Sequence, residues 1–80
     1  MNTREAVANR ILKLSEKRNL SLNALARLSA IPPSTLKNII YGVSGNPGIV
    51  TIKMLCDGLE ITLGEFFNSA EFNALEQEIK

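Results

Sequence analysis

The side chains best suited to chemistry in this sequence lie on one short stretch, residues 34–41. Ser34, Lys37, Asn38 and Tyr41 follow the spacing i, i+3, i+4 and i+7, so a helix would present all four on one face. They supply a hydroxyl, a cation, an amide and a phenol, and no acid. Such groups hydrogen-bond to base edges and hold phosphates. An ordinary solvent-exposed helix can carry the same set of side chains. The surrounding elements must therefore decide between a DNA-contacting helix and an ordinary surface helix.

Catalytic and metal-binding chemistry is nearly absent from the sequence. The chain has no histidine and one cysteine, Cys56, which excludes a Ser-His-Asp triad, an internal disulfide and a multi-cysteine zinc site. Cys56 falls on the apolar side of a predicted helix, where a small core residue is expected. The glycine-rich stretch "GVSGNPG" lacks the Gly-Lys-Ser/Thr ending of a phosphate-binding loop and predicts a turn. We expect no enzyme activity, no cofactor and no metal.

Two short helices joined by a tight turn are predicted within residues 20–42. Ser21 is a good N-cap for a helix over about 22–29, in which Leu25 and Leu28 would face the core. Three residues are left for the turn before the next helical pattern begins. This arrangement is a helix-turn-helix in outline.

The second of these helices begins at two adjacent prolines. Pro33 fits the first helical position, because an N–H is not needed there and the fixed φ of proline is already helical. The helix would cover about 33–41 and end at Gly42, which suits the left-handed position that closes a helix. Four apolar side chains would bury the angle between the two helices: Leu25, Ile31, Leu36 and Ile39.

The remaining segments are also helical in pattern, and none alternates with the period of a strand. The sequence therefore predicts an all-α fold, a compact bundle of five or six short helices. The first helix would cover about 4–18 and turn Arg10, Lys13 and Lys17 toward solvent. After the helix over 33–41, one helix would cover about 49–58. A short helix would follow the capping box formed by Thr62 and Glu65, and a last one would follow Ser69. The apolar stripe of this last helix is Phe72, Leu75 and Ile79.

Charge is divided unevenly along the chain. Residues 1–55 carry eight basic and two acidic side chains, a balance of +6, whereas residues 56–80 carry one basic and six acidic side chains, a balance of −5. This clustering fits either an ordinary solvated surface or a basic body that meets a polyanion while an acidic tail stays away from it. No apolar run approaches the ~18 residues of a membrane span, and no secretory leader is evident, so we expect a cytoplasmic protein.

Residues 20–67 resemble the Cro/repressor-type (XRE) helix-turn-helix domain of bacterial and phage transcription regulators. The resemblance rests on the order and spacing of short motifs: Leu20-Ser21, Leu25-Ala26, Ser34-Thr35, Gly42, Asn46-Pro47, Leu63 and Phe66-Phe67. With the first helix it covers roughly 65 residues, and it implies a lambda-repressor-like fold. Three positions depart from the common pattern. Leu22 stands where many relatives have glutamine, Pro33 where Gln or Arg is frequent, and Ala30 replaces the usual turn glycine.

The resemblance implies double-stranded DNA binding by a small transcriptional regulator, most simply a repressor, with helix 33–41 in the major groove. The expected DNA-binding residues are Ser21, Pro33, Ser34, Thr35, Lys37, Asn38, Tyr41 and Ser44, and further phosphate contacts are expected from Arg27, Arg10 and Asn46. The alternative is a protein-interaction module of the same fold, such as an antitoxin or an adaptor, with little or no DNA binding.

Residues 1–68 are expected to form the DNA-binding domain, and residues 69–80 a C-terminal helix or tail. A domain of this size reads few base pairs, so specificity implies a homodimer on two half-sites. The tail would supply the dimer contacts through Phe72, Leu75 and Ile79, unless this stripe folds back on its own domain. The expected partners are double-stranded DNA and a second copy, without a membrane or a small-molecule ligand.

Overall fold

A computed structural model describes residues 1–43 and 45–79 of the chain. The described part is all-α and contains no strand. Its six helices are α1 (Thr3–Lys17), α2 (Leu22–Leu28), α3 (Pro33–Ile40), α4 (Ile49–Leu59), α5 (Leu63–Phe67) and α6 (Ala70–Asn73). The all-α prediction of five or six short helices is confirmed, and the ends of α1 to α4 lie within one residue of those predicted. None of the helices in the described ranges is long and apolar enough to cross a membrane.

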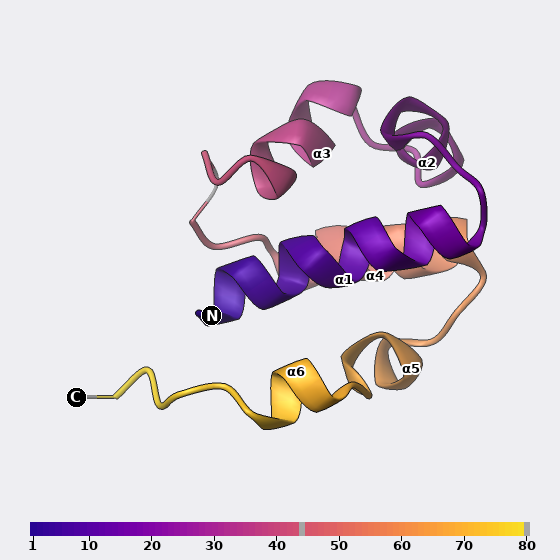
Figure 1. The fold of residues 1–80 in the computed structure, drawn as a ribbon. Coiled ribbons are helices and arrows are strands. Elements are labelled where there is room, and N and C mark those ends of the chain that lie inside the picture. Colours follow the sequence, from indigo (N-terminus) through magenta and orange to yellow (C-terminus); the bar gives the residue numbers. More distant parts are fainter. Residues whose placement is uncertain (44, 80) are drawn as a thin grey trace.

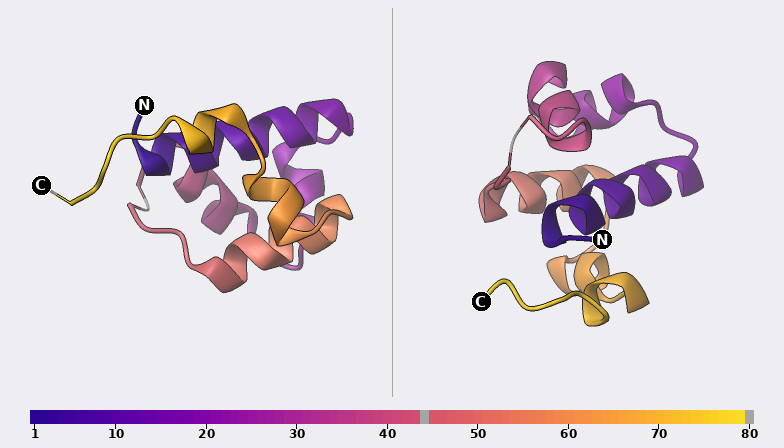
Figure 2. Two further views of the ribbon diagram at one scale, coloured as in Figure 1. Left: turned by 90° about the horizontal axis from the view of Figure 1, so that it is seen from below. Right: turned by 60° about the vertical axis from the view of Figure 1, so that its left-hand side comes forward.

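The helices form three layers. In Figure 1, α1 and α4 run through the middle of the molecule, α2 and α3 cover one side, and α5 and α6 cover the other, and the views in Figure 2 agree. Helix α2 packs on both α3 and α4, α1 packs on α3 and α6, and α4 packs on α5. The helix-turn-helix is therefore an outer layer, and the opposite outer layer holds the C-terminal segment away from it.

Local sequence signals start most of these helices. Asn2 and Thr62 each form a capping box with the glutamate three residues later, and the side chain of Ser21 accepts a hydrogen bond from the Ala24 N–H. At the second box, the backbone N–H and the hydroxyl of Thr62 hydrogen-bond the Glu65 carboxylate and lower its pKa. Because each cap is a contact between residues three apart, these helix starts are determined locally.

One apolar core joins the three layers. It is built from α1, the helix-turn-helix, α4 and α5, and its largest fully buried side chains are Phe66, Ile11, Leu25, Leu36, Leu55, Leu59 and Cys56. The placement of Cys56 in the core is confirmed, and burial raises the pKa of its thiol. A neutral, buried thiol is a packing residue, which is the role that the sequence predicted.

Arg10 of α1 and Arg18, the residue that caps the end of α1, bind the C-terminal ends of other helices. Arg10 donates from Nε to the Phe66 carbonyl and from Nη2 to the Glu65 carbonyl, both at 2.7 Å, and Arg18 donates to the Leu59 carbonyl at the end of α4. Terminal carbonyls lack partners within their own helix and carry the negative end of its dipole, so a cation there is favourable. The prediction that Arg10 faces solvent is wrong, because its guanidinium is half-buried against α5.

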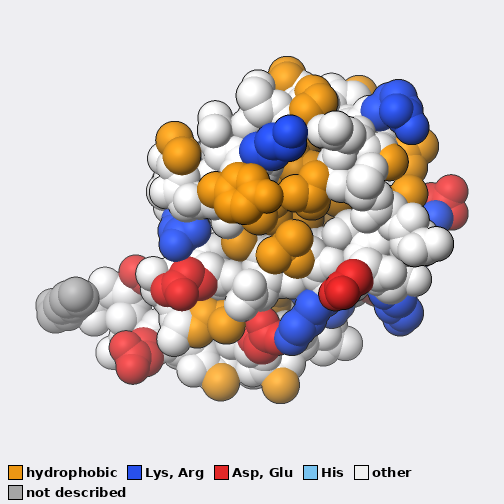
Figure 3. All heavy atoms as spheres, turned by 45° about the horizontal axis from the view of Figure 1, so that its top comes forward, with side chains coloured by type: hydrophobic (Ala, Val, Ile, Leu, Met, Phe, Trp, Pro, Cys, Tyr) orange, Lys and Arg blue, Asp and Glu red, His pale blue; other side chains and the backbone are white. Residues whose placement is uncertain are grey.

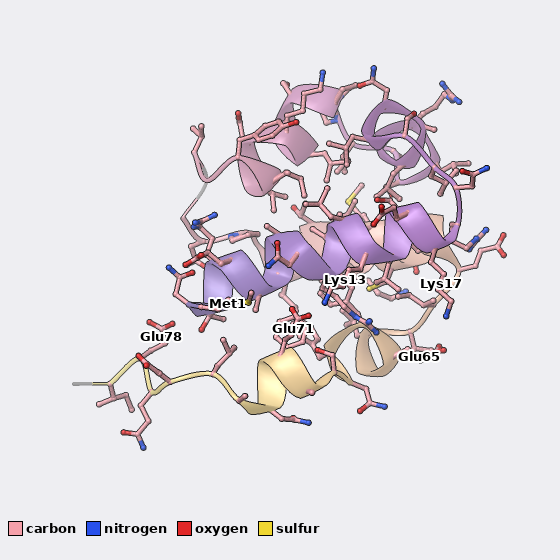
Figure 4. The ribbon with its side chains drawn as sticks, in the orientation of Figure 1. Met1, Lys13, Lys17, Glu65, Glu71 and Glu78 are labelled. Carbon is pink, nitrogen blue, oxygen red and sulfur yellow. The ribbon has the colours of Figure 1, made fainter. Side chains whose placement is uncertain are left out.

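The C-terminal segment is tied to α1. Lys13 pairs with Glu71 of α6, as Figure 4 shows, and the Thr3 hydroxyl donates to a Glu78 carboxylate oxygen at 2.6 Å. Phe72 joins an aromatic cluster in which its ring centroid lies 5.0 Å from that of Phe67. This stripe residue therefore packs on its own domain.

The predicted continuation of the last helix is wrong. Helix α6 ends at Asn73, so Leu75 and Ile79 lie beyond it in non-helical chain, and Ile79 is 88% exposed. A short helix is stable in water only when it buries an apolar face. Phe72 packs against the core, whereas the half-buried Leu75 and the exposed Ile79 are not among the described side chains that pack on it.

A close backbone contact joins α2 to α4. Gly58 of α4 lies against the end of α2, and a Cβ built on it would be 2.3 Å from the Ser29 Oγ, 3.1 Å from the Ser29 N and 3.2 Å from the Leu28 C. Leu25 and Ala26 of α2 and the cap residue Ser29 are buried. The expected burial of Leu28 is therefore wrong: it lies on the other side of α2 and is 54% exposed.

Replacing Gly58 by alanine should destabilise the protein. The intrinsic helix preference for alanine favours the change by about 1 kcal/mol, but the methyl group must displace the backbone of α2, which costs about 1–3 kcal/mol. We expect a lower Tm for Gly58→Ala in thermal unfolding. Gly64→Ala is the matched control on α5, where the nearest atom to an added Cβ is 3.8 Å away, and it should raise Tm.

Ser29→Ala tests the same contact from the α2 side. The Ser29 Oγ is buried and has no hydrogen-bond partner in the described structure, so its removal should keep or raise stability and reduce the cost of Gly58→Ala. A Gly58→Ala variant as stable as the parent protein would contradict the close contact.

Removing the Arg10 guanidinium should loosen α5. Arg10→Ala leaves two terminal carbonyls without their charged donor, and we expect a loss of about 2 kcal/mol in the free energy of unfolding. Arg10→Lys should restore only part of it, because an ammonium group cannot span both oxygens. Lys13→Ala is the control, since it breaks an exposed ion pair worth roughly 0–1 kcal/mol. Equal losses for Arg10→Ala and Lys13→Ala would argue against the arginine's role.

Candidate nucleic-acid interface

The turn between α2 and α3 has the geometry of a Schellman motif. The Ala30 N–H donates to the Arg27 carbonyl and the Ile31 N–H to the Ala26 carbonyl, while Ala30 adopts φ of 58°. Ile31 is buried directly after the turn, as are the predicted partners Leu25, Leu36 and Ile39. The predicted burial of the angle between α2 and α3 is confirmed, and it fixes how α3 is presented.

Helix α3 begins and ends where its sequence predicts. Pro32 is the N-cap residue, Pro33 occupies the first helical position, and Gly42 follows the helix with φ of 82°. The guanidinium of Arg4 lies beside Gly42, only 3.2 Å from where a Cβ would stand. A side chain at position 42 would thus force an unfavourable φ and would contact Arg4 in the first turn of α1.

The outer face of α3 is open to solvent and has no acid. Ser34, Lys37, Asn38 and Tyr41 are exposed, and Thr35 is half-buried toward α4. Pro33 is exposed as well, next to Ser34. The structure thus brings the predicted α3 residues to one surface, and this surface offers donors, acceptors and one cation.

The N-terminus of α4 completes this surface, which the sequence had not indicated. A groove of about 160 Å³ separates α3 from the start of α4, and its lining includes Thr35, Asn38, Gly48 and Thr51. Gly48 caps α4 without a side-chain hydrogen bond, and the first turn contains no acid. Free backbone N–H groups at a helix start favour anions. The signal available in the sequence was Pro47-Gly48 before an apolar helical run.

Other predicted residues are distributed around this surface. Arg27 is exposed in the last turn of α2, and the Ser21 side chain is engaged as the α2 cap. Asn46 lies on the α3–α4 connection and lines a larger groove of about 660 Å³ beside the start of α1. Arg10 does not join this surface, because its guanidinium binds α5. Ser44 lies outside the described residues.

Ion pairing reduces the basic excess of the N-terminal part. Lys13 pairs with Glu71, and Lys53 pairs with Asp57 on the same helix. Neither Arg27 nor Lys37 takes part in an ion pair within residues 1–43 and 45–79. In Figure 3 the acidic side chains lie mainly in the lower half, with the C-terminal segment, while basic side chains are present over the α2 and α3 half. Acidic side chains are thus concentrated away from the α2 and α3 half, whereas basic side chains lie in both halves.

Comparisons with known proteins agree with this geometry. Residues 10–69 match the family model of the Cro/C1-type HTH DNA-binding domain. The crystal structure of prophage Lp1 protein 11 is 32% identical, with a TM-score of 0.81, over 94% of this chain and 100% of that one. An HTH_3 family transcriptional regulator from Vibrio cholerae is 34% identical, with a TM-score of 0.73, over 80% of this chain. This chain spans 35% of that regulator's length. No curated protein sequence matches.

Ala30→Gly should stabilise the turn that orients α3. A left-handed φ costs a non-glycine residue about 1–2 kcal/mol, and the greater freedom of glycine in the unfolded chain cancels part of the gain. Ala30 is exposed, so no packing is lost. We expect a net gain of about 0.5–1 kcal/mol and a Tm higher by a few degrees. Glu60→Gly, at φ of 60° after α4, should also raise Tm, and Gly42→Ala should lower it. A fall in Tm for Ala30→Gly would count against the turn geometry.

Proposed function

This chain belongs to the family of Cro/C1-type helix-turn-helix DNA-binding domains, and we propose that it is a sequence-specific transcriptional regulator that acts as a repressor. The observation that carries the proposal is the exposed, acid-free face of α3 beside an uncapped helix N-terminus. A repressor of this kind acts where cellular or phage DNA is transcribed, in the cytoplasm. Its simplest action is to occupy DNA that the polymerase needs.

In this proposal α3 lies in the major groove. Asn38 is the side chain suited to adenine, through paired contacts to N6 and N7, and Lys37 is suited to guanine O6 and N7 or to a phosphate. Ser34 can bond either kind of base. Pro33 offers only apolar contact, for instance to a thymine methyl group. Base reading therefore depends on three residues within five positions.

Phosphates on either side of the groove would hold α3 in place. The backbone N–H groups of Leu22 and Asn23 at the start of α2, with Arg27 nearby, form one clamp. The N-terminus of α4, with the Thr51 hydroxyl in the groove beside α3, forms the other. Most of these contacts are neutral N–H and hydroxyl donors, so they position the helix without carrying sequence information.

Binding and its salt dependence test the proposal. A duplex selected from random DNA should bind the protein with an affinity that falls steeply with salt. Lys37→Ala should weaken all duplexes and reduce the salt slope by about 1, Asn38→Ala should relax specificity at one base pair by about 1–3 kcal/mol, and the double variant should lose binding. Fluorescence anisotropy measures each affinity.

The matched control is Lys13→Ala, which removes the same charge from the face that carries the C-terminal segment. It should leave DNA affinity nearly unchanged. If the parent protein at micromolar concentration and about 50 mM salt binds no duplex, the regulator proposal fails. The alternative, a protein-interaction module such as an antitoxin, then becomes the better account of the α3 face.

A further inference from the structure

Arg4 is a half-buried cation that the proposed DNA contacts do not use. It stands in the first turn of α1, where the positive end of the helix dipole disfavours a cation. Among the residues that the structure describes, no acid lies within ion-pairing distance of its guanidinium. Arg4 therefore lacks the stabilising role that Arg10 has at the end of α5.

The Arg4 guanidinium lies against the start of the α3–α4 connection. Its Nη1 would be 3.2 Å from a Cβ at Gly42, the second residue after α3. Arg4 also lines the groove of about 660 Å³ together with Asn46 and Pro47, which lead to the N-terminus of α4. The guanidinium is thus placed between the end of α3 and the phosphate clamp that we propose at α4.

A carboxylate from the other end of the chain reaches the same groove. Glu78 lines it, and its Oε2 accepts the hydrogen bond of 2.6 Å from the Thr3 hydroxyl, 75 positions away in the sequence. Figure 4 shows Glu78 near the start of α1, and in Figures 1 and 2 the C-terminal segment runs past the N-terminus. The start of a helix favours a carboxylate, because its first N–H groups lack partners within the helix.

We propose that Arg4 binds a phosphate of the DNA backbone and that Glu78 weakens this contact. A guanidinium beside α3 gains affinity from a phosphate that flanks the major groove. A carboxylate in the same groove lowers the electrostatic potential that attracts this phosphate. The C-terminal segment thus reduces the DNA affinity of its own chain. This inference rests on the proposed DNA binding.

The contact of Arg4 with DNA is tested first, by fluorescence anisotropy on a selected duplex. Arg4→Gln should weaken binding by about tenfold and reduce the salt slope by about 1, because one phosphate contact is lost. Arg4→Lys keeps the charge and should keep the slope. A purely structural role would lower the affinity without changing the slope, and thermal unfolding should show that each variant folds.

The effect of the C-terminal carboxylate is tested on the same duplex. Glu78→Gln should raise the affinity by about two- to fivefold, which is what an exposed charge pair is worth. In the Arg4→Gln background it should have little effect, because the charge that it opposes is gone. Thr3→Val removes the hydroxyl that holds the carboxylate and leaves the net charge unchanged, so it should also raise the affinity.

The matched control is Glu16→Gln, which removes the same charge from an exposed position near the other end of α1. It should leave the affinity nearly unchanged. Equal gains from Glu78→Gln and Glu16→Gln would reveal a general effect of net charge and overturn the proposal. The proposal is also wrong if Glu78→Gln gives no gain, or gives a gain that persists in the Arg4→Gln background.

The same measurements separate this inference from the proposed function. If the parent protein binds a duplex and Arg4→Gln binds it with equal affinity and an equal salt slope, the function stands and the inference alone is wrong. If the parent protein binds no duplex, the proposed function fails and the inference fails with it.

Discussion

The close approach of α2 to α4 at Gly58 is the constraint on which the presented surface depends. A Cβ at Gly58 would meet the backbone at the end of α2, so only glycine allows α2 to lie this close to α4. The position of α2 sets the Schellman turn at Ala30, and the turn sets the direction of α3. A displacement of α2 is thus transmitted to α3 through backbone hydrogen bonds, without any change in the residues that face outward.

Several cationic side chains of this chain already have partners within the fold. Arg10 and Arg18 are used at the ends of α5 and α4, and Lys13 and Lys53 are paired with acids. Arg27 and Lys37 remain beside the exposed face of α3. In the proposed function, neutral donors at helix N-termini would share the positioning of DNA phosphates with these two cations.

Sequence reasoning succeeded where the determining contacts are local. The caps at Asn2, Ser21 and Thr62, the prolines before α3 and the glycine after it each act within a few residues, and the helix ends follow from them. It failed where the partner is distant in the chain. The carbonyl bound by Arg10 lies 56 residues away, and the residue against the end of α2 is Gly58 in another helix. The last helix was predicted from a stripe of which Phe72 packs against the core while Ile79 is exposed. The α3 face was predicted from its helical period. The α4 N-terminus beside it could not be predicted in this way, because the fold brings it next to α3 across a groove.

Pro33 limits what the proposed DNA face can read. Proline at the first helical position starts α3 without a side-chain cap, but it offers no hydrogen bond at a position that faces outward. In the proposed function, one domain would read bases with Ser34, Lys37 and Asn38. At about 1–3 kcal/mol per good contact, these three residues are too few to select one site in a genome. The homodimer that the sequence predicts would double the number of bases read and so supply the selectivity that one α3 lacks.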